Sequence, residues 1–460
     1  MTQLDFSRLN LKTEISENLK TLGYQQMTPI QAKSIEPILK GHDVLARAKT
    51  GSGKTASFGI GLISKLNTEK KRPQALVLCP TRELADQVAK EIRRLARRLP
   101  NVKILSLCGG SPIGPQIASL EHGAHCIVGT PGRVQDHLRK KTLNLRNIKT
   151  LVLDEADRML DMGFLETLKE IIACTPNYRQ TLLFSATYPD DIASLSGDLQ
   201  KQPIVIKVEE SSQKIDIEEL FFETTLDKKD RLLSDILSFY NPESTIIFCN
   251  TKKKCQDLAD SLLAQGYSAG AIHGDLDQYE RDQVLTLFSN KSLSILTATD
   301  VAARGIDIND LAAVINYELA HDPQVHIHRI GRTGRAGKKG LAFSISTKKD
   351  AIKLENIKKV SQRDLTFGQH DSLECRNSKK LLPTMKSIRI NGGKKNKLRP
   401  TDILGALTRN GKLSGNYVGK INIFDFHTIV AIERNQIDSA LDALAGGKIK
   451  GRLFKVMKVI

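Results

Sequence analysis

The feature that most constrains this chain is Thr150-Leu-Val-Leu-Asp-Glu-Ala-Asp157, an apolar run that passes directly into three acidic residues within four positions. An apolar run of this kind is typical of a strand in the centre of a parallel sheet. Open α/β sheets bind their ligands just outside the carboxyl ends of the strands, so Asp154 and Glu155 lie where chemistry is expected. The alternative is an ordinary strand-to-helix turn, in which Asp157 caps a helix that begins at Arg158 and the other acids are solvated.

A second stretch requires an acid of this kind. Val44-Leu-Ala-Arg-Ala-Lys-Thr-Gly-Ser-Gly-Lys-Thr55 reads as a strand, a glycine-rich loop and a helix start, and it lacks only the first glycine of a phosphate-binding loop. The backbone N–H groups of such a loop surround a phosphate, and the N-terminus of the following helix adds positive charge. We expect these residues to bind the nucleotide: Ala48, Lys49, Thr50, Gly51, Ser52, Gly53, Lys54 and Thr55.

The two stretches together predict ATP and Mg²⁺ as cofactors. Lys54 is expected to reach the β- and γ-phosphates, and the hydroxyl of Thr55 is expected to hold the metal. Asp154 would complete the metal site through water, and Glu155 would orient the attacking water. The seven cysteines are scattered without a C-x-x-C pair, so no second metal or redox centre is expected.

Length and composition predict a multidomain protein of the cytoplasm. A chain of 460 residues is too long for one hydrophobic core, which favours two or three domains. No run of 18 apolar residues is present, and the first residues lack the basic and apolar segments of a secretion signal.

The positive charge is concentrated near the end of the chain. The formal net charge is +18, and residues 371–460 hold 18 Lys and Arg against 7 Asp and Glu. A basic surface of this strength most often meets phosphates, either of nucleic acid or of an acidic membrane. The alternative is a solvated face that only keeps the protein soluble.

Apolar strands alternate with helical patterns twice along the chain, which is the signature of parallel α/β sheets. The first series of expected strands is 44–46, 75–79, 126–129, 150–153 and 181–184. A polar stretch over 201–216 is interpreted as a linker, and the second series is 245–249, 268–272, 294–296, 313–316 and 341–345. The end of the chain reads strand, helix, strand, strand, helix, strand, a split βαβ order. The expected domains are therefore 1–205, 216–365 and 384–460.

Several further motifs stand in the order found in the DEAD-box RNA helicases, which this chain resembles over nearly its whole length. They are Gly23-Tyr24, Thr28-Pro-Ile-Gln31, Pro80-Thr-Arg-Glu-Leu-Ala85, Gly109-Gly110, Thr130-Pro-Gly-Arg133, Asp154-Glu-Ala-Asp157, Ser185-Ala-Thr187, Phe248-Cys-Asn-Thr251, Gln278-Tyr-Glu-Arg281, Ala298 to Asp307 and His328-Arg-Ile-Gly-Arg-Thr-Gly-Arg335. The resemblance implies two tandem RecA-like lobes. Lys49 and Met27 depart from the family, which usually has glutamine and proline there.

The resemblance also implies roles for individual residues. Phe6 would stack on the adenine and Gln31 would bond its edge, with Gly305 and Asp307 also contacting the nucleotide. Coupling of hydrolysis to strand separation would involve Asp157, Ser185, Thr187 and His328. The RNA backbone would be held by Thr81, Arg82, Gly110, Thr130, Gly132, Arg133, Thr251, Gln278, Arg281 and Thr299.

Arg332 and Arg335 are the expected cations for the transition state of phosphoryl transfer, which spreads negative charge over the γ oxygens. Because they belong to the other lobe, hydrolysis would require closure of the two lobes, and RNA bound across both would favour that state. The alternative for Arg329, Arg332 and Arg335 is a solvated basic turn, which the neighbouring glycines fit.

The tail resembles a bacterial branch of the family in which an RRM-like module binds a hairpin of the large-subunit ribosomal RNA and acts in subunit assembly. An ordinary RRM stacks bases on aromatic residues of its first and third strands, but here those strands offer only His427. Recognition is therefore expected to rest on Lys394, Lys395, Lys397 and Arg399, with Lys448, Lys450 and Arg452 as a second cluster. Tyr417, Phe424 and Phe426 are interpreted as core residues.

The sequence thus predicts an ATP- and Mg²⁺-dependent RNA helicase, a monomer that melts short duplexes near a ribosomal RNA site in pre-ribosomal particles and binds no membrane. Two alternatives stay open at this point. One is an RNA clamp that binds ATP without turnover, and the other is a DNA-unwinding motor, which an RRM-like tail disfavours.

Overall fold

The computed structural model describes residues 5–48, 51–185, 187, 190–208, 216–303, 310–334, 339–370, 373, 380, 382–409 and 413–459. The chain divides into two compact units, residues 1–211 and 212–460. Among the described residues, no helix combines the length and the apolar character needed to cross a membrane.

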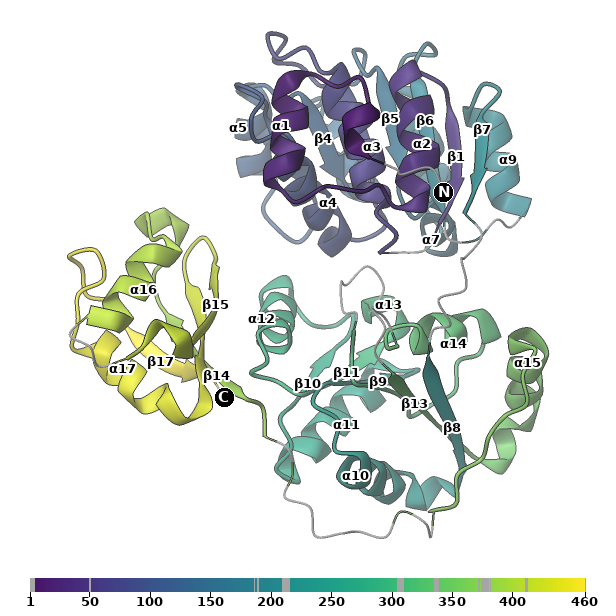
Figure 1. Ribbon diagram of the computed structural model, residues 1–460. Coiled ribbons are helices and arrows are strands. Elements are labelled where there is room, and N and C mark those ends of the chain that lie inside the picture. Colours follow the sequence, from purple (N-terminus) through teal and green to yellow (C-terminus); the bar gives the residue numbers. More distant parts are fainter. Residues whose placement is uncertain are drawn as a thin grey trace. The chain divides into compact units, whose positions relative to one another are not determined.

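The first unit is a parallel sheet with helices on both faces (Figure 1). Its strands lie in the order β3-β4-β2-β5-β6-β1-β7. The strands are β1 (Val44–Arg47), β2 (Ala75–Leu78), β3 (Ile104–Leu107), β4 (Cys126–Gly129), β5 (Thr150–Leu153), β6 (Gln180–Ser185) and β7 (Ile204–Lys207). The helices are α1 (Thr13–Thr21), α2 (Pro29–Lys40), α3 (Lys54–Lys65), α4 (Arg82–Leu95), α5 (Gly114–Glu121), α6 (Pro131–Arg139), α7 (Ala156–Asp161), α8 (Leu165–Ala173) and α9 (Asp190–Leu199).

Alternation within the strands explains the two layers of helices. Val77 and Val152 pack into one core with α2, α3 and α4, whereas their neighbours Leu76 and Leu153 pack into a second core with α6 and α8. Each fully buried aliphatic side chain contributes about 1.5–3 kcal/mol to folding. Both faces of the sheet are therefore apolar, as the uninterrupted apolar runs predict.

Strand β7 corrects the linker expected over residues 201–216. Its four residues pair in parallel with β1, and of these only Ile206 is buried. Its sequence, Ile-Val-Ile-Lys, is apolar, but the run is short and lies within a stretch that is otherwise rich in Lys, Gln, Glu and Ser, which is why it was interpreted as part of a linker. Strands β3 and β8 were missed because both mix polar residues with apolar ones.

The second unit begins with another parallel sheet, in the order β10-β11-β9-β12-β13-β8. Its strands are β8 (Ile217–Glu223), β9 (Thr245–Cys249), β10 (Ala269–Ile272), β11 (Ile295–Thr299), β12 (Ala313–Asn316) and β13 (Gly340–Ser346). Its helices are α10 (Lys229–Tyr240), α11 (Lys252–Ala264), α12 (Gln278–Ser289), α13 (Asp300–Ala303), α14 (Pro323–Ile330) and α15 (Ala351–Ser361). We refer to this part as the second lobe.

The tail folds as an antiparallel sheet in the order β15-β16-β14-β17. Its elements are β14 (Met385–Ile390), α16 (Pro400–Thr408), β15 (Val418–Ile423), β16 (Thr428–Glu433), α17 (Ile437–Ala445) and β17 (Val456–Val459). This order is that of a split βαβ domain, so the fold class expected from the sequence is confirmed: two parallel α/β lobes and a small RRM-like domain.

One face of the tail's sheet packs on α16 and α17, and the opposite face contacts the second lobe. Ile429 and Val459 cluster with Leu287 of α12. In the same contact Ser387, which is fully buried, accepts from the Asn290 amide at 2.9 Å. The face on which an ordinary RRM binds bases is therefore covered at these positions.

Candidate nucleotide and RNA sites

The phosphate loop connects β1 to α3 and is held by Thr28, which caps α2, and by Gln31 in the first turn of that helix. Gly53 adopts φ +95°, and a Cβ at this position would lie 2.5 Å from the Gln31 amide nitrogen. The Thr28 hydroxyl donates to the Ser52 carbonyl at 2.8 Å, and the Gln31 amide donates to the Gly53 carbonyl at 3.3 Å. Gln31, expected to read the adenine edge, thus also fixes the shape of the loop.

Phe6 lies in the core of the first unit instead of presenting an open face. Its side chain is 5% exposed and its ring meets Tyr24 edge to face, with ring centroids 5.5 Å apart. Ala48 is also buried, and its N–H donates to the Ser185 carbonyl at 2.9 Å. Lys49 and Thr50 lie outside the described residues, as do Gly305, Asp307 and Arg335.

Lys54 begins α3 as a buried ammonium group. It is 5% exposed, and its Nζ has no hydrogen-bond partner among the described residues. A buried cation without a partner is strongly unfavourable unless an anion binds beside it. The residue therefore fits a phosphate group of ATP, which would also meet the N-terminus of a helix of 12 residues.

Asp154 and Glu155 follow β5 and are both nearly inaccessible to solvent. Burial raises the pKa of Asp154 to about 6, while the charge of Lys54 acts in the opposite direction. No group of three or more acidic, His or Cys side chains among the described residues forms a ready metal site. Mg²⁺ keeps several waters and shares phosphate oxygens, so Thr55 and Asp154 fit its binding beside the nucleotide.

Glu155 occupies an unusual backbone conformation, with φ 52° and ψ 52° at the residue before α7. Non-glycine residues in this region are strained by about 1–3 kcal/mol and cluster at functional sites. Its Oε2 lies 3.1 Å from Nη1 of Arg158, and both side chains are largely buried. Sequence reasoning missed Arg158, although its position one helical turn after Glu155 was a signal.

Asp157 does not act as the helix cap considered in the sequence, because α7 already begins at Ala156. Its carboxylate accepts from the Thr187 N–H at 2.9 Å and from the Thr187 hydroxyl at 2.8 Å. Ser185 in turn donates to the Thr187 carbonyl at 2.6 Å. The structure thus brings together the three residues expected to couple hydrolysis to strand separation in the first unit.

The residues expected to hold RNA in the first unit gather at the carboxyl ends of β2, β3 and β4. Thr81 caps α4 after β2, and Thr130 precedes α6 after β4. Gly110, after β3, has φ +75°, and a Cβ there would lie 1.6 Å from a guanidinium nitrogen of Arg82. Arg133 donates twice to the Ser111 carbonyl, at 3.0 and 3.1 Å.

These positions divide the sheet edge into two halves. The expected RNA residues follow β3, β4 and β2, whereas the expected nucleotide and coupling residues follow β5, β6 and β1, and this is the order in which the strands lie. Gly132 adds a position at which a Cβ would meet no atom within 4 Å, so the space above its backbone is open to the backbone of a ligand. One edge therefore presents both sites side by side.

In the second lobe the expected RNA residues lie at the carboxyl ends of β9, β10 and β11. Thr251 caps α11 and Thr299 ends β11. Gln278 starts α12, and Arg281, one turn later, donates to the His273 carbonyl at 3.4 Å. Arg281 is thus anchored in the loop that follows β10.

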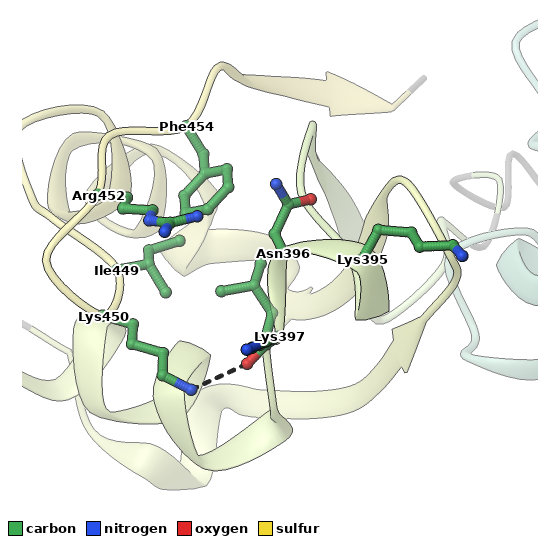
Figure 2. Close-up of a pocket in the computed structure, with 8 residues that line it drawn as sticks. Lys395, Asn396, Lys397, Ile449, Lys450, Arg452 and Phe454 are labelled. Atoms are coloured by element: carbon green, nitrogen blue, oxygen red, sulfur yellow. Dashed lines mark hydrogen bonds between the residues drawn. The ribbon is translucent and has the colours of Figure 1, made fainter.

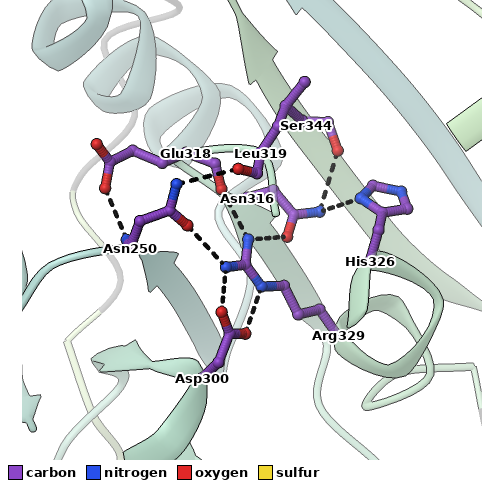
Figure 3. Close-up of polar contacts among 8 residues, drawn as sticks. All are labelled: Asn250, Asp300, Asn316, Glu318, Leu319, His326, Arg329 and Ser344. Carbon is purple, nitrogen blue, oxygen red and sulfur yellow. Dashed lines mark hydrogen bonds and ion pairs between the residues drawn. The ribbon is translucent and has the colours of Figure 1, made fainter. Parts of the chain in front are cut away.

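Arg329 is the centre of a buried polar network that joins β9, β11 and β12 (Figure 3). It is 2% exposed and holds Asp300 through two bonds of 2.7 Å. It also donates to the side chains of Asn316 at 3.2 Å and Asn250 at 3.0 Å, and to the Glu318 carbonyl at 2.7 Å. The alternative of a solvated basic turn is therefore wrong for Arg329.

The same turn carries two more of the expected residues. Arg332 is 8% exposed and follows α14, so the solvated alternative fails for this residue as well. His328 lies in the last turn of α14. The partners that make Arg329 a positioning residue, Asp300 and Asn316, were not singled out from the sequence because they come from separate strand ends.

The tail presents a basic hollow of about 310 Å³ between two loops (Figure 2). Its lining residues are Lys395, Asn396, Lys397, Leu398, Ile449, Lys450, Arg452 and Phe454. The Lys450 ammonium donates to the Lys397 carbonyl at 3.0 Å and so connects the loops. Both basic clusters expected from the sequence meet here, while the side chain of Lys395 points away from the others. Lys394 and Arg399 are exposed on the same segment.

Comparison with known proteins identifies all three parts of the chain. Residues 28–195 match the DEAD/DEAH box helicase model, residues 228–337 the helicase conserved C-terminal domain, and residues 387–458 the DbpA RNA binding domain. The chain is 50% identical to the ATP-dependent RNA helicase DbpA of Escherichia coli (strain K12), over 98% of each chain. It is 42% identical to the DEAD-box ATP-dependent RNA helicase CshA of Geobacillus kaustophilus, over 78% of this chain and 77% of that one.

A solved structure of S. cerevisiae Dbp5 bound to RNA and ADP BeF3 is also similar. It has a TM-score of 0.72 and 32% identity, and the match covers 80% of this chain and 96% of the other.

Proposed function

The chain belongs to the DEAD-box ATP-dependent RNA helicases and carries a DbpA RNA-binding domain, and from this premise we propose that its tail directs local duplex unwinding to a hairpin of the large-subunit ribosomal RNA. Membership makes it an RNA-dependent ATPase, which removes the non-catalytic clamp and the DNA motor as alternatives. The proposed setting is the assembly of large subunits in the cytoplasm, within pre-ribosomal particles, with the protein acting as a monomer.

ATP with Mg²⁺ would supply the γ-phosphoryl group and neutralise its charge. The buried Lys54 ammonium, which has no hydrogen-bond partner among the described residues, would hold the phosphates. Thr55 and Asp154 would hold the metal, and Glu155 would orient water with its carboxylate positioned by Arg158. Preorganised charges of this kind provide most of the catalysis of phosphoryl transfer.

The arginines of the second lobe would make hydrolysis depend on RNA. Arg332 and Arg335 belong to the second unit, whereas Lys54 and Glu155 belong to the first. RNA contacts are proposed on both units, so bound RNA would favour the arrangement in which the arginines reach the nucleotide. The Asp157–Thr187 contact would transmit the state of the nucleotide site to the end of β6.

The observation that carries the targeting proposal is the basic hollow of the tail. The two loops that form it contribute four Lys and Arg to its lining, Lys395, Lys397, Lys450 and Arg452, in a domain without ATPase motifs. Cationic surfaces hold RNA phosphates, and the RRM-like module recognises structured RNA with unpaired bases.

A lysine substitution tests this targeting. The triple variant Lys394→Ala, Lys395→Ala, Lys397→Ala should bind large-subunit ribosomal RNA with a salt-dependence slope lowered by about one per contacting lysine removed. Its ATPase activity at saturating RNA should stay near that of the parent, because these lysines lie outside both lobes.

The matched control is Lys349→Ala, Lys358→Ala, Lys359→Ala, which removes the same charge from exposed positions of the second lobe. Filter binding at several salt concentrations gives both slopes. If the tail variant binds ribosomal RNA as tightly as the parent and has the same salt-dependence slope as the control variant, this loop is only a solvated surface and the targeting proposal fails.

A further inference from the structure

The tip of the hairpin between β15 and β16 carries an exposed aromatic ring. The Phe424 N–H donates to the His427 carbonyl at 2.9 Å, so Asp425 and Phe426 form a tight turn. Phe426 is 72% exposed, which corrects the interpretation of this residue as part of the core. Phe424 is partly buried against the cluster of Leu287, Ile429 and Val459, as a core residue would be.

The turn is fixed to the basic loop by backbone contacts. The Lys394 N–H donates to the Phe424 carbonyl at 2.8 Å, and the Lys395 N–H donates to the Asp425 carbonyl at 2.9 Å. Gly393 permits this approach, because a Cβ there would lie 2.2 Å from the Phe424 carbonyl oxygen. The ring of Phe424 also stacks on His427, with centroids 4.5 Å apart and planes 10° from parallel.

The backbone bonds that fix this turn to the basic loop have two consequences for Phe426. Its backbone is held in place before any ligand arrives, so little ordering entropy would oppose binding. The segment Lys394–Lys397, to which this turn is bonded through its backbone, carries exposed lysines that can meet phosphates. Asp425 lies 3.9 Å from the Lys394 ammonium, but both side chains are more than 60% exposed, and such a pair is weak.

An exposed aromatic beside cations on a fixed turn is the combination that binds single-stranded nucleic acid, in which a base stacks on the ring and phosphates meet the cations. We propose that Phe426 stacks on an unpaired nucleobase of the RNA whose phosphates are held by the loop Lys394–Lys397. A paired base is already stacked within its helix, so the ligand is a base in a loop or a single-stranded flank. This inference rests on the proposed function of the tail and names a contact within it.

Loss of a stacked base lowers the affinity for RNA without changing its salt dependence, whereas loss of a cation changes both. Phe426→Ala should lower the affinity of the full chain for in vitro transcribed large-subunit ribosomal RNA by about 5- to 150-fold, the range for loss of one stacked base. The slope of affinity against salt should not change, because no charge is removed. Phe426→Tyr should restore most of the affinity, since it restores the ring.

The chain contains no tryptophan, so a direct measurement is also available. Phe426→Trp introduces the only indole, whose fluorescence should be quenched when the RNA is added. The matched control is Tyr178→Trp, because Tyr178 is 93% exposed and has the Lys201 ammonium 4.7 Å from its ring centroid, in the first unit. The control should show little change.

Unchanged affinity of Phe426→Ala at equal salt, together with an unquenched indole in Phe426→Trp, would overturn the inference. A separate measurement, binding of the parent to unrelated RNA, tests the proposed ribosomal RNA target. If the parent binds unrelated RNA of equal length as tightly as ribosomal RNA, the proposed target is wrong, whereas quenching by either RNA still supports stacking. Circular dichroism of each variant verifies the fold, which an exposed position should leave intact.

Discussion

Removal of the Arg329 side chain tests whether the buried network of the second lobe holds its strand ends in place. In Arg329→Met the apolar volume is largely kept, but Asp300 loses two bonds of 2.7 Å and the carbonyl and amide groups of Asn250, Asn316 and Glu318 lose a donor. Breaking a buried ion pair from one side costs about 3–5 kcal/mol.

The lower end of that range applies here, because the Asp300 side chain is 25% exposed and retains some solvation. A loss of about 3 kcal/mol corresponds to a local opening constant roughly 150-fold larger. Amide hydrogen exchange of β9, β11 and β12 in the full chain reports this opening. Exchange in these strands should therefore accelerate about 150-fold, while exchange in the first unit should not change.

Lys359→Ala is the matched control, since Lys359 pairs with Glu355 at 2.7 Å on α15 but both side chains are about two-thirds exposed. A surface pair contributes at most about 1 kcal/mol, so exchange should change by less than about fivefold. The double variant Arg329→Met, Asp300→Asn should be less destabilised than the sum of the single variants, because no buried charge is left unpaired. An acceleration below tenfold in Arg329→Met would refute the role assigned to the network.

Two further predictions concern the nucleotide site. Lys54→Ala should abolish ATP hydrolysis, because the buried cation for the phosphates is lost, while RNA binding by the tail persists; phosphate release and filter binding measure the two, and undiminished turnover would contradict the assignment. Glu155→Gln should still bind ATP and RNA but hydrolyse about 10²- to 10⁴-fold more slowly, because only the orientation of water is lost. A Glu155→Gln protein that fails to bind nucleotide would show that the residue has a different role.

Elements whose signal lies in a few consecutive residues could be predicted from the sequence, whereas features that depend on distant residues could not. The strands β4, β5, β9 and β12 have the bounds expected from their apolar runs, because turn residues flank each run and both faces are buried. The edge strand β7 was missed because its short apolar run, Ile204–Lys207, lies within a polar stretch that was interpreted as a linker. The phosphate loop could be predicted because the pattern that indicates it consists of consecutive residues.

The burial of Arg329, in contrast, could not be predicted from residues near it in the sequence. Its neighbours in sequence include glycines and further arginines, which also fit a solvated turn and do not predict burial. Its burial arises only when the ends of β9, β11 and β12 are adjacent, and their order in the sheet cannot be read from the local pattern. Phe426 was misassigned for a related reason, because an aromatic residue between strands is usually core unless the turn directs it outward.

The contact between the tail and the second lobe explains why recognition would rest on loops. The first and third strands of the tail, β14 and β16, present Ser387, Ile429 and Ala431 on the face away from the helices, and all three are buried. That face lacks aromatic residues on its strands, and Leu287 and Asn290 cover it at Ile429, Val459 and Ser387, so a base could not stack at these positions. We therefore expect contacts with RNA at the rim of the domain, where the basic hollow and the ring of Phe426 are exposed. A tail that binds RNA at its rim could keep its sheet against the second lobe while RNA is held, and the proposed RNA binding would then be linked to the position of that lobe.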